Sequence, residues 1–342
     1  MHHTKTTWAA PYNRGTVNRA LLIGLAAATL AFAPAGHAQD AKAWLDSQSL
    51  EGAESKAFQE FEVVVARVPG AKDPAAAAER VVILKQGKPV WQSGPKDAEA
   101  GSRWTLHSLG RDLDGDGQPD VHFSSHGNAG QCCTVHHVYR LKPQVRKVAS
   151  YAAGNVAGGE FLDLPGRKAP VMISADDSSA NVFAPYANSY FPMLVLEVAP
   201  KGRFEFARDL MQSKLPGQPP PVCAQPAATA NPWLKERCAE YVTSRRQART
   251  TDIKNRLADI KAGRAADKLK WEDYYATGVL AAVSAEINRY TYTGHGSAGF
   301  NWLETIWPGN DAIKLKFVST LRQSQGKSVF AEDLKGLAAD YR

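Results

Sequence analysis

The sequence lacks the long apolar runs of membrane proteins and the clustered basic residues of nucleic-acid-binding proteins. After the first 38 residues it contains no apolar run of 18 or more residues, which excludes a polytopic membrane protein. The charge is nearly balanced, with 41 Lys and Arg against 34 Asp and Glu, and the basic residues are scattered, so we expect no nucleic-acid partner. The 342 residues are 44% hydrophobic, which is ordinary for a globular protein and indicates about two domains.

The sequence also lacks the motifs of common enzyme classes. It has no Gly-x-Ser-x-Gly or His-Glu-x-x-His motif, no phosphate-binding loop and no dinucleotide-binding fingerprint. We interpret Asp176 and Asp177 as part of a polar turn rather than as a pair of glycosidase carboxylates. The sequence therefore favours a protein that is not an enzyme.

Residues 1–38 are typical of a secretory signal. Their first part carries basic residues and no acidic one, and an apolar core follows at 21–32. Small residues, Gly36 and Ala38, precede the expected cleavage before Gln39. The apolar core is too short to span a bilayer, so we expect no membrane span after cleavage and a periplasmic or secreted location. Such a compartment is oxidising and permits disulfides.

In the rest of the sequence the pattern of residues changes once, from strand-like to helical. Short strand-like runs alternate with Gly, Pro and Asp turns up to about residue 211, which predicts a β-rich domain over 39–214 with partial propeller-like or sandwich-like antiparallel sheets. A Pro-rich linker over 215–232 and an α-helical domain over 233–342 follow. The predicted fold class is therefore α+β. The strand-like runs are 61–68, 80–93 (with a hairpin turn at 86–88), 135–141, 169–174 and 192–198.

In the last third of the sequence, capping residues and the spacing of apolar residues indicate helices. Asn231 followed by Pro232 is typical of a helix start, because an Asn side chain caps the first turn and Pro suits its first position. Further starts are expected at 310–311 and near 330. Apolar residues expected to be buried at helical spacing are Ile253, Leu257, Ile260, Ile313, Phe317 and Leu321.

The most specific motif is an acidic loop. Its carboxylates fall at positions 1, 3, 5 and 9, as Asp112, Asp114, Asp116 and Asp120. Such spacing presents alternate side chains to one centre, and Ca²⁺ requires six to eight oxygen ligands, so we predict a Ca²⁺ site with the carbonyl of Gln118 at position 7. Phe123 occupies position 12, where an EF-hand has Glu, so an EF-hand is disfavoured. The alternative is an acidic turn that binds no ion.

The run DLDGDGQPDVHF resembles the calcium loop of FG-GAP/VCBS-type repeats, which occur in β-propellers and in exported bacterial proteins. The continuation SSHGNAGQCCTVHHVYRL is similar to a Gly-rich, Cys-Cys-containing stretch of exported bacterial proteins with such a loop. The resemblance implies a β fold held by calcium, and no reaction. A second copy beginning at Asp163 lacks the acidic residues, so one intact loop is present.

Four cysteines allow three pairings. We favour the local pairs, Cys132 with Cys133 and Cys223 with Cys238, because each lies within its own predicted domain. A Cys223–Cys238 bridge would tie the Pro-rich segment to the first helix.

Histidines surround the Cys-Cys pair and leave a second metal hypothesis open. His122, His126, His136 and His137 could bind zinc or copper together with the thiolates. However, His136 and His137 are adjacent in a predicted strand and point to opposite faces, and no spacing matches an established zinc motif.

These observations favour an exported, calcium-stabilised binding or structural protein of the cell envelope, with an envelope protein or a glycan as partner. One alternative is an exported hydrolase acting on glycan or peptide with its site between the two domains. A second alternative is redox or transition-metal handling through Cys132-Cys133 and the nearby histidines.

Overall fold

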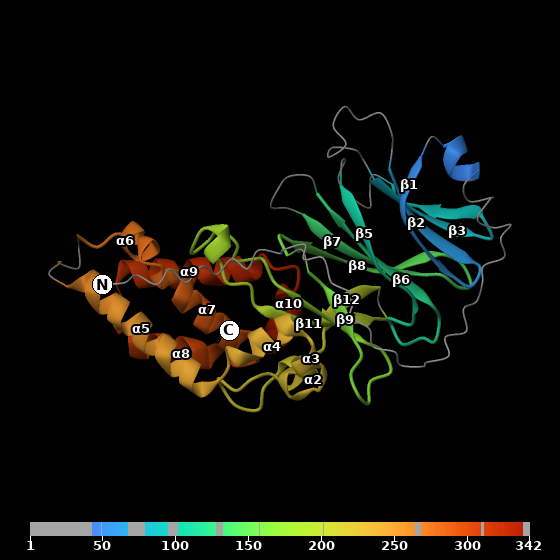
Figure 1. Cartoon of the computed structure of the whole chain (residues 1–342). Helices are drawn as coiled ribbons and strands as arrows, with labels where there is room; N and C mark the ends of the chain where they lie inside the picture. The colour runs from blue at the N-terminus through green and yellow to red at the C-terminus, as the bar shows by residue number, and fades with distance from the viewer. Residues whose placement is uncertain are drawn as a thin grey trace, which may run out of the picture.

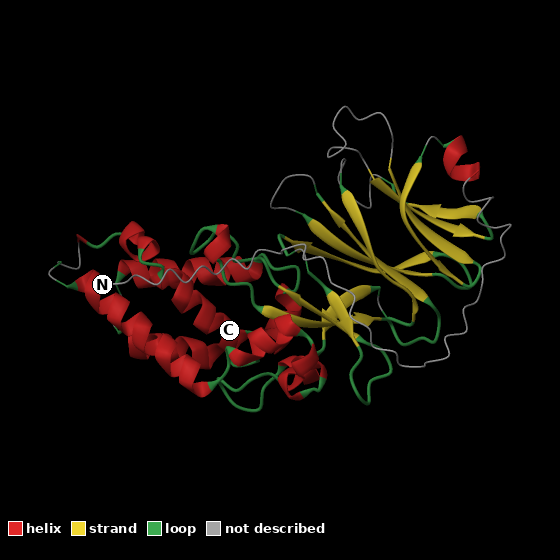
Figure 2. Cartoon of the chain, in the orientation of Figure 1, coloured by secondary structure: helices red, strands yellow, loops and turns green. Residues whose placement is uncertain are grey.

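The computed structural model describes residues 43–48, 50–67, 79–94, 102–127, 133–156, 158–200, 202–262, 264, 268–308 and 311–337. Within these residues the chain forms antiparallel sheets and then a helical region, which confirms the predicted α+β fold (Figure 1, Figure 2). The predicted signal lies outside the described residues.

The β region consists of three four-stranded sheets, and each takes its strands in chain order as an antiparallel meander. The first sheet contains β1 (Glu51–Phe58), β2 (Phe61–Arg67), β3 (Glu79–Lys85) and β4 (Lys88–Gln92). The second contains β5 (Arg103–Arg111), β6 (Asp120–His126), β7 (Thr134–Arg140) and β8 (Arg146–Gly154). The third contains β9 (Glu160–Leu162), β10 (Val171–Ala175), β11 (Met193–Ala199) and β12 (Arg203–Phe206).

The predicted hairpin turn between β3 and β4 is confirmed. Gln86 and Gly87 connect the two strands and have φ values of 51° and 76°. Two consecutive residues with positive φ are typical of a type I′ turn, whose twist matches that of paired strands.

The sheets pack on one another through alternating apolar side chains. Val63, Val81 and Ile83 of the first sheet meet Val121 and Phe123 of the second. The opposite face of the second sheet packs against the third. A short helix at 43–47 covers the outer face of the first sheet. The two central strands of the second sheet, β6 and β7, are thus buried on both faces along nearly their whole length. Alternate residues of the outer strand β5 stay exposed.

The helices lie beside the third sheet, on the side away from the first (Figure 1). No helix among the described residues is both long enough and apolar enough to cross a membrane. Their bounds, with η for 3₁₀ helices, are η2 (Tyr186–Asn188), α2 (Arg208–Met211), η3 (Pro221–Ala224), α3 (Ala227–Ala230), α4 (Pro232–Ala239), α5 (Thr243–Lys261), α6 (Trp271–Ala276), α7 (Val279–Thr291), α8 (Gly296–Ile306), α9 (Ala312–Gly326) and α10 (Ala331–Leu337).

The predicted helix starts are confirmed by their caps. The Asn231 side chain accepts a hydrogen bond from the Leu234 amide at 2.8 Å, at the start of α4. Asp311 accepts one from the Lys314 amide at 2.7 Å, at the start of α9. The expected apolar residues of α5 and α9 are buried, except that Ile313 is only half-buried.

Three residues of the Pro-rich segment 215–232 are buried, namely Pro220, Val222 and Ala228. The segment forms η3 and α3, and Val222 is completely buried in a core that also contains Leu196 of β11 and Leu334 of α10. Cys223 and Cys238 form a disulfide that joins η3 to α4, as predicted. One apolar core is therefore shared by the third sheet and the helices that follow it.

A buried carboxylate also joins the sheet to the helices. Asp176, directly after β10, accepts a hydrogen bond from the Tyr292 hydroxyl at 2.6 Å and another from the Ser328 hydroxyl. Asp177 accepts hydrogen bonds from the amide and the side chain of Asn155. Both acids therefore have structural partners, in agreement with their interpretation as a polar turn.

Replacing both Cys223 and Cys238 with Ala should lower the free energy of unfolding by about 3 kcal/mol, because the unfolded chain gains the freedom of a loop of about 15 residues. Denaturant unfolding under oxidising conditions measures the change. The exposed-site substitution Asp259→Ala on α5 serves as a control, with an expected change within about 0.5 kcal/mol. An unchanged midpoint in the double variant would contradict the role given to this bridge.

Candidate metal centre

The acidic loop connects β5 to β6, at the end of the hairpin that starts the second sheet. Gly115 and Gly117 have φ values of 76° and 87°, which allow the backbone to curl around the acidic side chains. One carboxylate oxygen from each of Asp112, Asp114 and Asp116 lies within 4.8 Å of the others. Three of the four predicted carboxylate ligands are thus brought together.

Main-chain amides hold these carboxylates in place. The two oxygens of Asp112 accept hydrogen bonds from the amides of Gly115, at 2.7 Å, and Gly117, at 2.8 Å. Asp116 accepts one from the amide of Gln118 at 2.9 Å. Gln118 therefore takes part through its amide, and the role of its carbonyl as a ligand stays a prediction.

Asp120 differs from the other three because its side chain is fully buried. One of its oxygens, Oδ2, accepts a hydrogen bond from the Leu113 amide at 2.8 Å, and the other, Oδ1, has no partner among the described residues. Burial raises the pKa of Asp120 to about 7, and the charges of Asp114 and Asp112 act in the same direction. An unpartnered buried carboxylate oxygen is costly unless a cation or a donor meets it.

Arg140 is a cation that reaches the loop. It lies on β7 directly opposite Asp120, and its guanidinium forms ion pairs with both Asp114 and Asp116. Burial raises the pKa of Asp114, while the Asp116 amide and Arg140 oppose that effect. One guanidinium therefore pairs with two of the four clustered acidic side chains.

The loop opens to solvent on one side. A shallow cavity of about 590 Å³ is lined by Asp116, Gln118 and Arg140 together with Glu60, Lys85, Lys142 and Pro143. An ion can therefore reach the carboxylates without a change in the surrounding sheets. Oxygen ligands alone, several of them charged, suit a hard cation such as Ca²⁺.

The structure separates the histidines of the Cys-Cys segment. His126 bonds to Thr134 at the far end of β6, and His137 packs between Trp104 and Phe123 on the face toward the first sheet. His122 and His136 lie together on the opposite face. Cys133 is disulfide-bonded, and its expected partner Cys132 lies outside the described residues, so that pairing stays a prediction.

Sequence reasoning missed one residue of this region, His107. It lies on β5 close to His122 and His136, and their ring nitrogens form a second compact group. The available signal was the hairpin itself, because pairing of the two strands that flank the acidic loop sets Ser108 opposite His122 and so brings the neighbouring His107 close to it.

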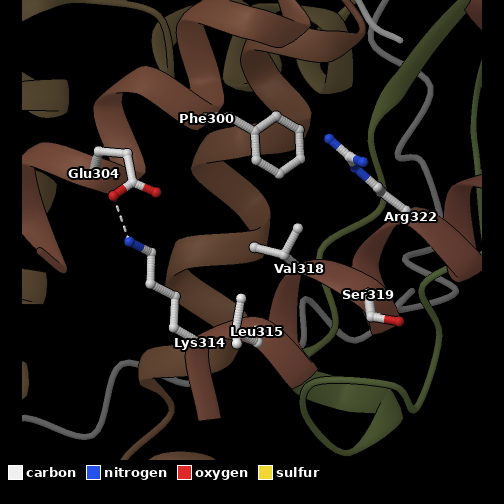
Figure 3. A pocket seen from close by; sticks show the side chains of 7 residues that line it. All are labelled: Phe300, Glu304, Lys314, Leu315, Val318, Ser319 and Arg322. Carbon is white, nitrogen blue, oxygen red and sulfur yellow. Dashed lines mark hydrogen bonds and ion pairs between the residues drawn. The ribbon is translucent and has the colours of Figure 1, made fainter. Parts of the chain in front are cut away.

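The helical region has a shallow groove between α8 and α9. Figure 3 shows its lining, with Phe300 facing Val318 and the Lys314 ammonium 2.5 Å from the Glu304 carboxylate. The groove measures about 490 Å³, and Glu304 is the one carboxylate among its described lining residues.

Comparisons with protein-family models, with curated proteins and with solved structures gave no match to this chain.

Asp120→Asn should stabilise the protein in excess chelator, on the order of 1–3 kcal/mol, because it removes a buried charge and keeps the acceptor for the Leu113 amide. The same variant should respond less to added Ca²⁺. Thermal unfolding with chelator and with Ca²⁺ measures both effects. Asp209→Asn, at an exposed acid that pairs with Arg167, is the matched control with little expected change. A loss of stability in chelator would show that the Asp120 charge is already compensated.

Proposed function

We propose that this chain is an exported binding or structural protein of the cell envelope whose β region is stabilised by a bound Ca²⁺ ion. The observation that carries the proposal is the convergence of three carboxylates beside Asp120, whose buried Oδ1 atom meets no partner in the described part of the chain. The resemblance of the loop to FG-GAP/VCBS-type calcium loops supports the same ion.

Electrostatics favour a bound divalent cation over an empty acidic turn. Two like charges at about 4 Å repel by about 1 kcal/mol in water and about 4 kcal/mol near a protein surface. Arg140 supplies one positive charge against four carboxylates. A divalent ion would supply two more, and in binding the carboxylates it would compete with the guanidinium for Asp114 and Asp116.

The position of the loop gives the ion a structural role. Leu113, between two of the predicted ligands, is fully buried in the core between the second and third sheets. Arg111, at the end of β5, reaches Asp163 of the loop between β9 and β10 at 2.9 Å. A cation that fixes the acidic loop would thereby fix the contact between two sheets, and its binding energy would contribute to folding.

Export and partner binding complete the proposal. The signal features of residues 1–38 and the Cys223–Cys238 disulfide are compatible with an oxidising compartment outside the cytoplasm. The helical region takes no part in the acidic loop, and we assign to it the contact with an envelope protein or glycan.

The direct test is thermal unfolding in millimolar Ca²⁺ and in excess chelator. Calcium at 100 times its dissociation constant should stabilise the native state by about 2.7 kcal/mol. For a unit of 150–250 residues, this corresponds to a rise in Tm of roughly 5–11 °C. Asp116→Ala should abolish the rise, because it removes one of the three converging carboxylates.

The matched control is Asp259→Ala, which removes an exposed carboxylate on α5 and should leave the calcium response intact. Equal Tm values with Ca²⁺ and with chelator in the unsubstituted protein would contradict the proposal. If Ca²⁺ still raises the Tm of the Asp116→Ala variant, the ion binds at another part of the chain.

A further inference from the structure

Three histidines from neighbouring strands meet on one face of the second sheet. His107 lies on β5, His122 on β6 and His136 on β7, and one ring nitrogen from each lies within 4.8 Å of the others. His122 Nε2 and His136 Nδ1 are only 3.1 Å apart. The strands run side by side in Figure 1, so the group is built on sheet rather than on loops.

A bulge in β5 places His107 in this group. Leu106 pairs with Phe123 and Ser108 pairs with His122, so His107 is the extra residue between two consecutive partners on β6. Bulges of this kind redirect a side chain and are common beside functional sites. Here the bulge brings the His107 ring onto the His122 ring, with their centroids 4.4 Å apart.

The inner part of the group is enclosed by β8 of the second sheet and β9 of the third. His122 and His136 are almost completely buried, with the Phe161 ring edge-on to His122 and the Tyr151 ring stacked on His136. A Cβ atom at Gly159 would lie 2.7 Å from the His136 ring, so the backbone there is as close as a glycine permits. His107, by contrast, is exposed, and it leaves one side of the group open to solvent.

Hydrogen bonds among the described residues satisfy these rings only in part. His136 Nε2 is buried and has no hydrogen-bond partner among the described residues. His122 and His136 are buried, and burial favours the neutral imidazole that a metal ion binds.

We infer that His107, His122 and His136 form a binding site for a first-row transition-metal ion, with Zn²⁺ as the expected occupant. Neutral imidazole is a preferred ligand of zinc and copper, whereas Ca²⁺ takes oxygen ligands. Three histidines with a fourth position open to solvent is the ligand set of zinc sites that keep a bound water. This site does not depend on the acidic loop, and it uses neither Cys132 nor Cys133.

The spacing of the nitrogens requires one adjustment. Zinc–nitrogen bonds of about 2.0–2.1 Å in a tetrahedral site place the nitrogens a little over 3 Å apart, close to the 3.1 Å between His122 and His136. The His107 and His122 rings are inclined by only 21°, so His107 must rotate to aim its nitrogen at the shared ion. Its exposure permits this, at the loss of the 2.8 Å contact between His107 Nε2 and the Ser124 hydroxyl.

Zinc titration of the untagged full chain, freed of metal by chelation and held in excess Ca²⁺, tests the inference. Calorimetry should detect a tight zinc site, and His107→Ala should remove that site or weaken it by at least about tenfold, since it removes a ligand. His107 is exposed, so the variant is expected to fold. Co²⁺ as a spectroscopic probe should give the strong visible absorption of a tetrahedral site in the unsubstituted protein and lose it in the variant.

His126→Ala is the matched control, because His126 lies on β6 but bonds to Thr134 outside the group. It should leave zinc affinity and the cobalt spectrum unchanged. The inference is overturned if the unsubstituted protein binds no zinc, or if His107→Ala binds it as tightly as before. Excess Ca²⁺ keeps the acidic loop occupied, so failure here and failure of the calcium proposal are distinguishable.

Discussion

The pairing of β6 with its two neighbours is the constraint on which both candidate metal sites depend. At one end it places Arg111, Asp120 and Arg140 side by side across three strands. Two residues further along β6, His122 lies between β5 and β7, within reach of His107 and His136. A slip of one residue in either pairing would turn these side chains to the other face of the sheet. The acidic turn and the bulge therefore also fix the register of the hairpin.

The burial of the second sheet explains why its polar residues are informative. Its central strands, β6 and β7, are covered by the first sheet on one face and by the third on the other. In such a position a polar side chain carries a free-energy cost unless it finds a partner. Asp120 and His136 each leave one atom, Oδ1 and Nε2 respectively, without a partner among the described residues. His136 belongs to one group of possible metal ligands, and Asp120 follows the other along the chain.

Local signals predicted much of this structure. The caps at Asn231 and Asp311, the turn at Gln86 and Gly87, and the disulfide between Cys223 and Cys238 depend on residues close together in the sequence, and all are present. The acidic loop was recognisable for the same reason, because its carboxylates lie within nine residues of one another. The α+β order followed from the change in periodicity along the chain.

The features that the sequence did not predict depend on strand register and on contacts between residues far apart in the chain. The group around His107 needs three strands to pair with a bulge at one position, and no alternation of residue types reveals where that extra residue lies. The bonds of Asp176 to Tyr292 and Ser328 span 116 and 152 residues. Periodicity assigns such residues to a strand or a turn, but their partners are set only when the sheets and helices pack together.

The shared core and the bonds of Asp176 have a consequence for the whole molecule. Pulling the helices away from the third sheet would expose the apolar surface around Leu196 and Leu334 and leave a carboxylate without its two hydroxyl partners. Sheet and helices are thus expected to open together rather than one after the other. An ion bound at the β5–β6 turn would then slow proteolysis in the distant helices. A partner bound to the helices would in turn raise the affinity of the loop for its ion.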